Sequence, residues 1–313
     1  MSTLRVRLFG TLQIDCGAGP PLRLSSRRLR DLLAYLALNR HVMHSRERLA
    51  GVFWGDCDEP KARHSLNTAV WRLATALAPA QRATASACLQ INAHEIGFNV
   101  GTDVWLDVAE FERCCDAAER ATTGEDAAMF YRQAVDVYTA DLLADCYEDW
   151  CILERERLQH RYLRALTRLL AWHVQAGQHE LGMDYAHQIL ALDPLREEIH
   201  RDLIQMQLGL GQYGAALRQY RACEGLLREE LGIEPLPETR ALLPRILQLA
   251  QATAAAAAER DCQRIAHIDE QLNARPELRP ILSSLRDAFQ ACEEVRGRLV
   301  DTVRLVERLT RPA

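Results

Sequence analysis

The sequence contains almost no lysine, and it lacks the common catalytic motifs. Lys61 is the only lysine among 38 basic residues. A nucleotide-binding P-loop needs a lysine beside the phosphates, so the rest of the chain cannot form one. Neither a Gly-x-Ser-x-Gly nor a His-Glu-x-x-His pattern occurs, and no pairing of a nucleophile with a base is apparent. We therefore expect a protein that is not an enzyme and that needs no cofactor.

Long apolar runs are also missing. No stretch of about 18 apolar residues exists, so the sequence offers no transmembrane helix. The first ten residues alternate instead of forming the apolar region of a signal peptide, and we expect a cytoplasmic protein. Ten cysteines are present without a C-x-x-C pair, the closest being adjacent Cys114 and Cys115. These features predict reduced thiols and no metal site.

The charge is distributed unevenly along the chain. Its 313 residues, 48% apolar and 26% charged, are enough for about two globular domains. The first 100 residues hold 13 basic and 7 acidic side chains, whereas the remainder holds 25 basic and 36 acidic ones. A positively charged N-terminal part followed by a negatively charged remainder indicates a polyanion-binding module fused to another domain. The alternative is a chance distribution of solvated charges.

In the first hundred residues, the spacing of apolar residues changes from the alternation typical of strands to the three-to-four-residue spacing typical of helices. Alternation at 3–9 and again at 22–24 predicts short antiparallel strands. Helical spacing follows, with Ser25 or Ser26 as the expected N-cap of a first helix and Ser45 as that of a second. A third helix is predicted to start near Pro60, and strands at 88–91 and 95–100 are predicted to form a hairpin. Three helices and a hairpin indicate a winged helix-turn-helix.

The third helix is predicted to present a DNA-binding face opposite its core. Leu66, Val70, Leu73 and Leu77 fall within about 60° of each other on a helical wheel. The opposite face has no acidic residue and carries hydrogen-bond donors with one aromatic ring, which suits the DNA major groove. Its candidate residues are Lys61, His64, Asn67, Thr68, Trp71 and Arg72. The alternatives are an ordinary solvated face and, for Trp71, packing against a neighbouring domain.

Separate roles are expected within this DNA-binding module. His64, Asn67, Thr68 and Trp71 are expected at base edges, between Lys61 and Arg72 at the two ends of the face. Phosphate contacts position a protein without specifying sequence. Four further residues are expected to make such contacts: Arg27, Arg28, Arg46 and His94.

The second part of the chain contains an internal repeat. Ala176-Gly177-Gln178 recurs 34 residues later as Leu210-Gly211-Gln212, between amphipathic helical segments. This period and the Gly-Gln turn are typical of tetratricopeptide repeats. The letters Gly209-x-Gly211-x-x-Gly214 match a dinucleotide-binding fingerprint, but they follow a helix, so we expect an interhelical turn.

Several segments match the motifs of one known family. They are residues 33–38, 45–55, 62–73, 193–197 and 229–235. With these segments the chain resembles the Streptomyces antibiotic regulatory protein (SARP) type of transcriptional activator over residues 4–250. Its second part resembles the bacterial transcriptional activator domain.

The resemblance implies a mainly α protein. We expect an OmpR-like winged helix-turn-helix with small antiparallel β elements at 1–101, an all-α tetratricopeptide-like domain at 102–250 and a helical extension at 251–313. It implies a sequence-specific transcriptional activator that binds direct repeats in double-stranded DNA, contacts RNA polymerase and pairs as a homodimer. After Leu66, where the family is richer in arginine, the third helix has Asn67, Thr68, Trp71 and Thr75 instead, so an operator sequence cannot be transferred.

Two features of the sequence each have alternative interpretations. The repeat domain is alternatively a protein-interaction scaffold or a sensor of a small-molecule effector, with a DNA-binding domain that no longer binds DNA. In the extension, an apolar residue recurs every seven residues at Leu285, Cys292, Leu299 and Val306. This predicts a helix that either caps the repeats or pairs with a second chain.

Overall fold

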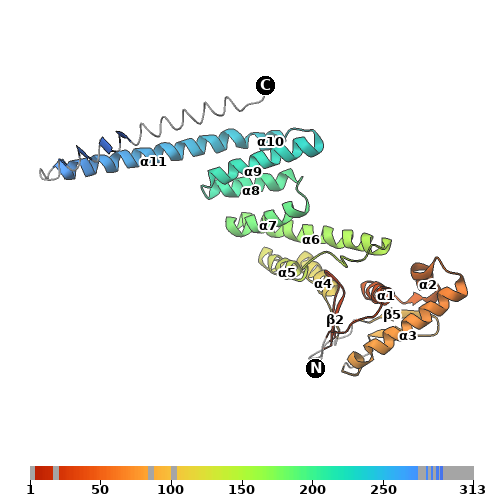
Figure 1. The fold of residues 1–313 in the computed structure, drawn as a ribbon. Coiled ribbons are helices and arrows are strands. Elements are labelled where there is room, and N and C mark those ends of the chain that lie inside the picture. Colours follow the sequence, from red (N-terminus) through yellow and green to blue (C-terminus); the bar gives the residue numbers. More distant parts are fainter. Residues whose placement is uncertain are drawn as a thin grey trace. The chain divides into compact units, whose positions relative to one another are not determined.

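The computed structural model describes residues 4–16, 21–83, 88–99 and 104–273, and seven residues between 280 and 291. The chain divides into two compact units, Met1–Leu242 and Leu243–Ala313. The first unit is mainly helical (Figure 1). No helix in the part of the chain that the structure describes is long and apolar enough to cross a membrane.

Two small sheets lie in the first unit. One has the order β2-β1-β6, with β1 (Leu4–Arg7) antiparallel to β2 (Gln13–Cys16) and parallel to β6 (Val104–Leu106). The other has the order β3-β5-β4, from His44–Ser45, Glu95–Phe98 and Leu89–Ile91. The strand predicted at 22–24 is wrong. That segment makes one backbone hydrogen bond to the sheet, from Leu22 N–H to the Ile14 carbonyl at 2.8 Å, which is too little pairing for a strand.

Three helices follow the first strands, as predicted. They are α1 (Arg27–Leu38), α2 (Arg46–Trp54) and α3 (Glu59–Ala83). The hydroxyl of Ser26 accepts a hydrogen bond from Leu29 N–H, and that of Ser45 accepts one from Arg48 N–H. These are N-caps, which satisfy backbone donors that have no partner inside the helix. Ser26, of the two serines considered, is therefore the cap of α1.

The body consists of successive helices that pack on their neighbours in chain order. They are α4 (Asp107–Arg120), α5 (Gly124–Val137), α6 (Asp149–Gln175), α7 (His179–Leu192), α8 (Glu197–Gly209) and α9 (Tyr213–Leu226). The turns after α6 and α8 contain Gly177 and Gly211, with φ of +69° and +70°. Only glycine adopts this left-handed conformation without strain. The Gly209–Gly214 segment is thus an interhelical turn, as expected.

One hydrophobic core joins the first strands and helices to the start of the body. Asp107, at the N-terminus of α4, is buried and accepts hydrogen bonds from the backbone N–H groups of Leu8 and Phe9 at 2.7 and 2.8 Å. Trp150 of α6 contacts the ring of Tyr35 of α1 edge-on, with centroids 5.3 Å apart. The cluster of buried residues accordingly runs without a break from β1 to α6.

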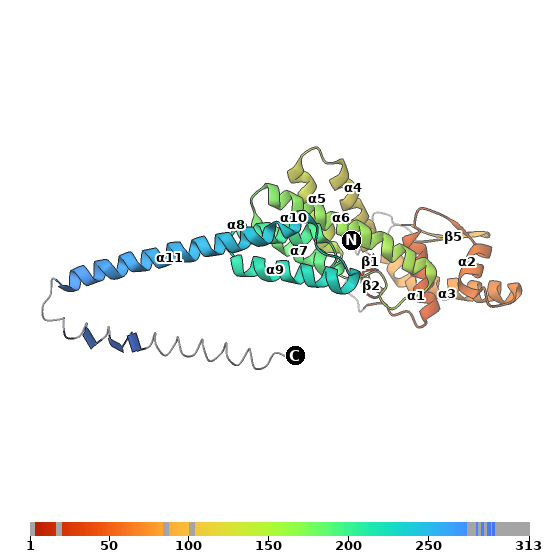
Figure 2. The same ribbon diagram turned by 90° about the horizontal axis from the view of Figure 1, so that it is seen from above.

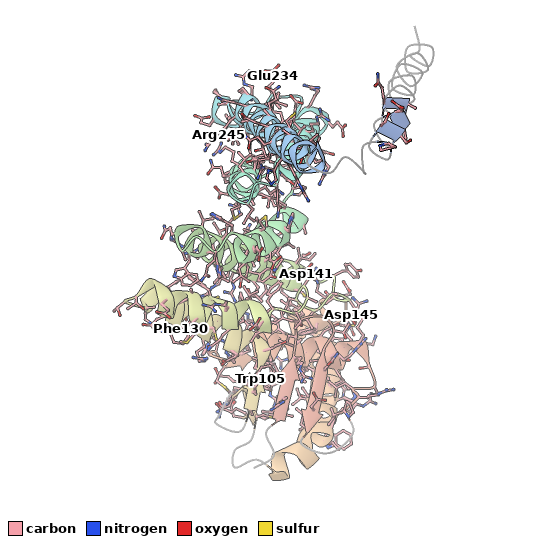
Figure 3. The ribbon with its side chains drawn as sticks, turned by 90° about the vertical axis from the view of Figure 1, so that its left-hand side faces the viewer. Trp105, Phe130, Asp141, Asp145, Glu234 and Arg245 are labelled. Carbon is pink, nitrogen blue, oxygen red and sulfur yellow. The ribbon has the colours of Figure 1, made fainter. Side chains whose placement is uncertain are left out.

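A row of ion pairs connects α6 to α4. On α6, arginines at 157, 161 and 164 face acidic residues at 112, 116 and 119 of α4. Both rows follow the helical i, i+4, i+7 spacing, so three pairs form in register. Asp145, in the segment between α5 and α6, is labelled in Figure 3. Its carboxylate pairs with Arg30 of α1 at 3.4 Å.

The cysteines of α4 are buried and unpaired. Cys114 and Cys115 are free thiols, and burial raises their pKa values to about 11 and about 12. Thiols with raised pKa values are poor nucleophiles because little thiolate forms near neutral pH.

The body ends with a π-helical turn at Leu227–Leu231 and the short α10 (Pro237–Arg240). α11 (Leu242–Asn273) follows and contains the alanine-rich segment 252–258 as continuous helix (Figure 2). The seven-residue pattern at Leu285, Cys292, Leu299 and Val306 lies outside the described residues.

Candidate nucleic-acid interface

The helix α3 has one buried and one exposed face. Leu66, Val70, Leu73 and Leu77 are all buried, as the periodicity predicts. Burial of this row fixes the rotation of α3 about its axis. The side chains on the other side of the helix must therefore point away from the core.

The structure brings the six predicted side chains of α3 onto that outer side. Lys61, His64, Asn67, Trp71 and Arg72 are exposed, and Thr68 is half-buried. Trp71 has 67% of its surface exposed, so it does not pack on a neighbouring domain within the described residues of the first unit. The Lys61 ammonium lies 3.9 Å from the Asp58 carboxylate, with 74% of the side chain exposed.

The N-terminus of α1 borders this face on one side. A groove of about 310 Å³ is lined by Arg28 of α1 together with His64, Thr68 and Arg72 of α3. Neither Arg28 nor Arg72 has an ion-pair partner among the residues that the structure describes. Arg27, by contrast, lies 3.7 Å from Asp31. Two uncompensated cations therefore share one groove, at the end of α1 where backbone N–H groups and the helix dipole favour anions.

The hairpin of β4 and β5 borders α3 on the other side. A groove of about 360 Å³ is lined by Ser45, Arg46 and Glu47 of the β3–α2 segment, Arg63 and Asn67 of α3, and His94 of the hairpin turn. Backbone pairing of Arg46 N–H with the His94 carbonyl at 2.9 Å holds the turn against α2. His94 itself is exposed at the tip of the turn.

Arg46 connects three elements through its guanidinium. One Nη donates to the Asn67 side-chain oxygen at 2.8 Å, and the other donates to the Asn92 carbonyl at 3.0 Å. The Asn92 side chain in turn accepts from the backbone N–H groups of His94 and Glu95 at 2.8 and 2.6 Å. Asn67 and the hairpin turn are therefore held in fixed positions relative to α2.

Arg63 also lines this groove beside the hairpin, a position that was not predicted from the sequence. This exposed side chain is hydrogen-bonded to Glu47 at 3.0 Å and to Glu59 at 2.8 Å. Its spacing of four residues from Glu59 is the signal that predicts the ion pair on a helix. Because two carboxylates surround it, Arg63 adds little positive potential to the groove.

The electrostatic arrangement suits an anionic, hydrogen-bonding partner. His44, just before the N-cap of α2, is buried, and burial together with nearby Arg48 lowers its pKa, so its ring is neutral at neutral pH. In the described ranges, no cluster of three or more His, Cys, Asp or Glu side chains is arranged to hold a metal ion. The chemistry available at this surface is therefore binding through guanidinium, imidazole, amide, hydroxyl and indole groups.

Comparison with known proteins identifies relatives of the chain. Residues 106–247 match the bacterial transcriptional activator domain family. The chain is 28% identical over 246 residues to the regulatory protein AfsR of Streptomyces coelicolor, in an alignment that covers 76% of this chain and 24% of AfsR. It is 23% identical over 256 residues to the transcriptional regulatory protein MoaR1 of Mycobacterium tuberculosis, covering 78% and 79% of the two chains. The chain thus spans about a quarter of the length of AfsR.

A solved structure shares the fold. Mycobacterium tuberculosis EmbR, in complex with a low-affinity phosphopeptide, superposes with a TM-score of 0.64 at 22% identity, covering 84% of this chain and 72% of EmbR. Its likeness is one of architecture, mainly helical with few small strands. The family match over residues 106–247 and the similarity to the two regulatory proteins confirm the resemblance predicted from the sequence motifs: the chain is similar to SARP-type transcriptional regulators, and this part of it matches the bacterial transcriptional activator domain.

Proposed function

We propose that this regulator binds double-stranded DNA sequence-specifically, with α3 inserted in the major groove. One observation carries the proposal: an acid-free row of exposed donors and one indole ring on α3, bordered by Arg28 on one side and Arg46 on the other. Surface helices ordinarily mix acidic and basic residues. A row without any acid avoids repulsion from DNA phosphates and leaves its donors free for bases.

The proposed domain division follows from this role. Residues 1–101 form a winged helix-turn-helix in which α3 is the recognition helix and the β4–β5 hairpin is the wing. Residues 102–250 form the tetratricopeptide-like activator domain, and 251–313 form an extension. Pairing of β1 with β6 and the shared core support the view that the first two parts act as one body.

Individual roles follow from position on the interface. His64, Asn67, Thr68 and Trp71 contact base edges, and Lys61 and Arg72 flank them. Arg27, Arg28, Arg46 and His94 contact phosphates, since they lie on α1, α2 and the hairpin on either side of α3. The first turn of α1 contains no acidic residue, which supports anion binding at its N-terminus.

The activity proposed at the promoter is activation. The relatives named as regulatory proteins, and the match to the bacterial transcriptional activator domain, support a role in transcription. The proposal extends this role to a cytoplasmic activator that binds direct repeats as a homodimer and contacts RNA polymerase through the activator domain. No catalytic step enters this proposal, because recruitment needs only binding surfaces.

Selection of bound fragments followed by mobility shifts at two salt concentrations tests DNA binding by the full chain. Trp71→Ala is the diagnostic variant, because an exposed ring is removable without disturbing the core. We expect its binding free energy for the selected site to become less favourable by about 1–3 kcal/mol. Arg221→Gln, at an exposed position of α9, is the matched control and should bind as the unmodified chain does.

Two outcomes would contradict the proposal. One is a folded full-length chain that shifts no duplex even at low salt, which would favour a protein-interaction scaffold. The other is a Trp71→Ala variant that binds the selected site and unrelated duplexes as tightly as the unmodified chain.

A further inference from the structure

A further groove lined by arginines lies in the body, apart from the two grooves that border α3. None of its residues belongs to the α3 face. It has a volume of about 560 Å³, within the range of small-molecule sites. Its walls come from α6 and from the turn between α7 and α8. The lining residues are His160, Leu163, Arg164, Thr167, Arg168, Asp193 and Arg196.

The charge of this groove is opposite to that of its surroundings. Beyond residue 100 the chain has 36 acidic and 25 basic side chains, yet three guanidinium groups and one carboxylate meet here. Arg164 and Arg168 are four residues apart on α6, a spacing at which like charges repel. Arg196 approaches from the turn between α7 and α8, where its Nε lies 3.0 Å from the Glu198 carboxylate. An anion placed among them would relieve this repulsion.

The row of ion pairs between α4 and α6 ends at this groove. Arg164 pairs with Glu119 at 3.3 Å, with Arg157 and Arg161 paired before it. Arg168 is the next residue of the row on α6, but α4 ends at Arg120, so its row of acidic residues does not continue to a fourth position. Among the described residues Arg168 has no ion-pair or hydrogen-bond partner. The fourth cation of the row thus lacks its anion.

We propose that this groove binds a small phosphorylated molecule, whose phosphate takes the place of the missing carboxylate. A guanidinium group offers paired N–H donors that match phosphate oxygens. Three such groups line the groove, those of Arg164, Arg168 and Arg196. Asp193 is an acceptor for a hydroxyl or amino group on the rest of the ligand. The binding itself does not depend on the proposed DNA contact. Only the use of this site to regulate DNA binding rests on the proposed function.

DNA phosphates offer the same chemistry, so the source of the phosphate has to be tested. Titration calorimetry of the full chain with pyrophosphate and, separately, with ATP measures the free ligand. We expect binding by the unmodified chain and about tenfold weaker binding by Arg168→Gln, because one charge-assisted contact is lost. Arg221→Gln on α9 is the control for a lost exposed charge and should bind both probes normally.

A second control excludes the α3 face. Arg72→Gln should leave pyrophosphate binding unchanged while weakening duplex binding, and Arg168→Gln should leave duplex binding unchanged. The proposal is overturned if the unmodified chain binds neither probe at millimolar concentration, or if Arg168→Gln binds them normally. It is also overturned if Arg168→Gln weakens duplex binding alone, which would assign the groove to the DNA backbone. The pyrophosphate and ATP results do not depend on whether α3 contacts bases.

Discussion

Arg46 at the start of α2 donates a hydrogen bond to the side-chain oxygen of Asn67 on α3, at 2.8 Å. The bond orients the Asn67 amide so that its N–H₂ group faces away from Arg46. Asparagine contacts adenine through an oriented amide, which accepts with its oxygen and donates with its nitrogen. A residue expected only at a phosphate thus also positions a residue expected at a base.

Replacing Arg46 should therefore affect sequence preference as well as affinity. In Arg46→Gln the Asn67 amide loses its fixed orientation, and we expect weaker discrimination at one base pair, by about 1–3 kcal/mol. Arg28→Gln, which removes no hydrogen bond of Asn67, should weaken binding to all sequences alike. Competition against a randomised site measures both. A uniform loss for Arg46→Gln, with preference intact, would show that the Arg46–Asn67 bond has no role in recognition.

Stability should depend on pH through Asp107. Burial is the largest cause that raises its pKa from 3.8 to about 6, against the lowering effect of its three backbone hydrogen bonds. A carboxyl with a raised pKa binds a proton more readily in the folded than in the unfolded chain. Its contribution to the free energy of unfolding is fully present below about pH 4 and falls, by about 3 kcal/mol, as the pH rises to about 6.

Asp107→Asn removes this titration while keeping one acceptor for Leu8 and Phe9. Urea unfolding of both proteins at pH 5 and pH 7 should show that the unmodified chain loses more stability over this interval than the variant does. Equal losses would mean that Asp107 does not titrate in this range.

The interhelical glycines should be needed for their backbone conformation alone. A Cβ at Gly211 would meet no atom within 4 Å, but φ is +70° there. We therefore expect Gly211→Ala to lower the stability by about 1–2 kcal/mol through strain. Gly225→Ala, inside α9 and equally unobstructed, should instead stabilise by about 0.5–1 kcal/mol. Thermal melts decide the matter, and a loss of equal size in both variants would point to packing instead of strain.

Local patterns predicted the elements but not the links between them. Helical periodicity was enough to place Leu66 and Leu73 inside and Trp71 outside, and the serines before α1 and α2 were recognisable as caps. These features depend on residues within one or two turns of each other. The sequence also indicated the hairpin, because its strands are joined by a short turn.

Long-range contacts had no comparable signal. The parallel pairing of β1 with β6, and the hydrogen bond from Leu8 N–H to the Asp107 carboxylate, join residues about a hundred positions apart. The Arg46–Asn67–Asn92 network likewise depends on how α2, α3 and the hairpin pack. Alternation at 22–24 was misleading because a strand also needs a partner along its length, and only Leu22 has one.

Lys61 allows the most direct test of the proposed DNA-binding face, since it carries the only lysine ammonium of the chain and lies at one end of the face. Acetylation of the full chain, followed by mass spectrometry, measures its accessibility with and without duplex. A duplex carrying the selected site should slow modification of Lys61 strongly, and an unrelated duplex at high salt should not. If the selected duplex is bound while Lys61 is acetylated at the rate of the free protein, α3 does not face the DNA as we propose.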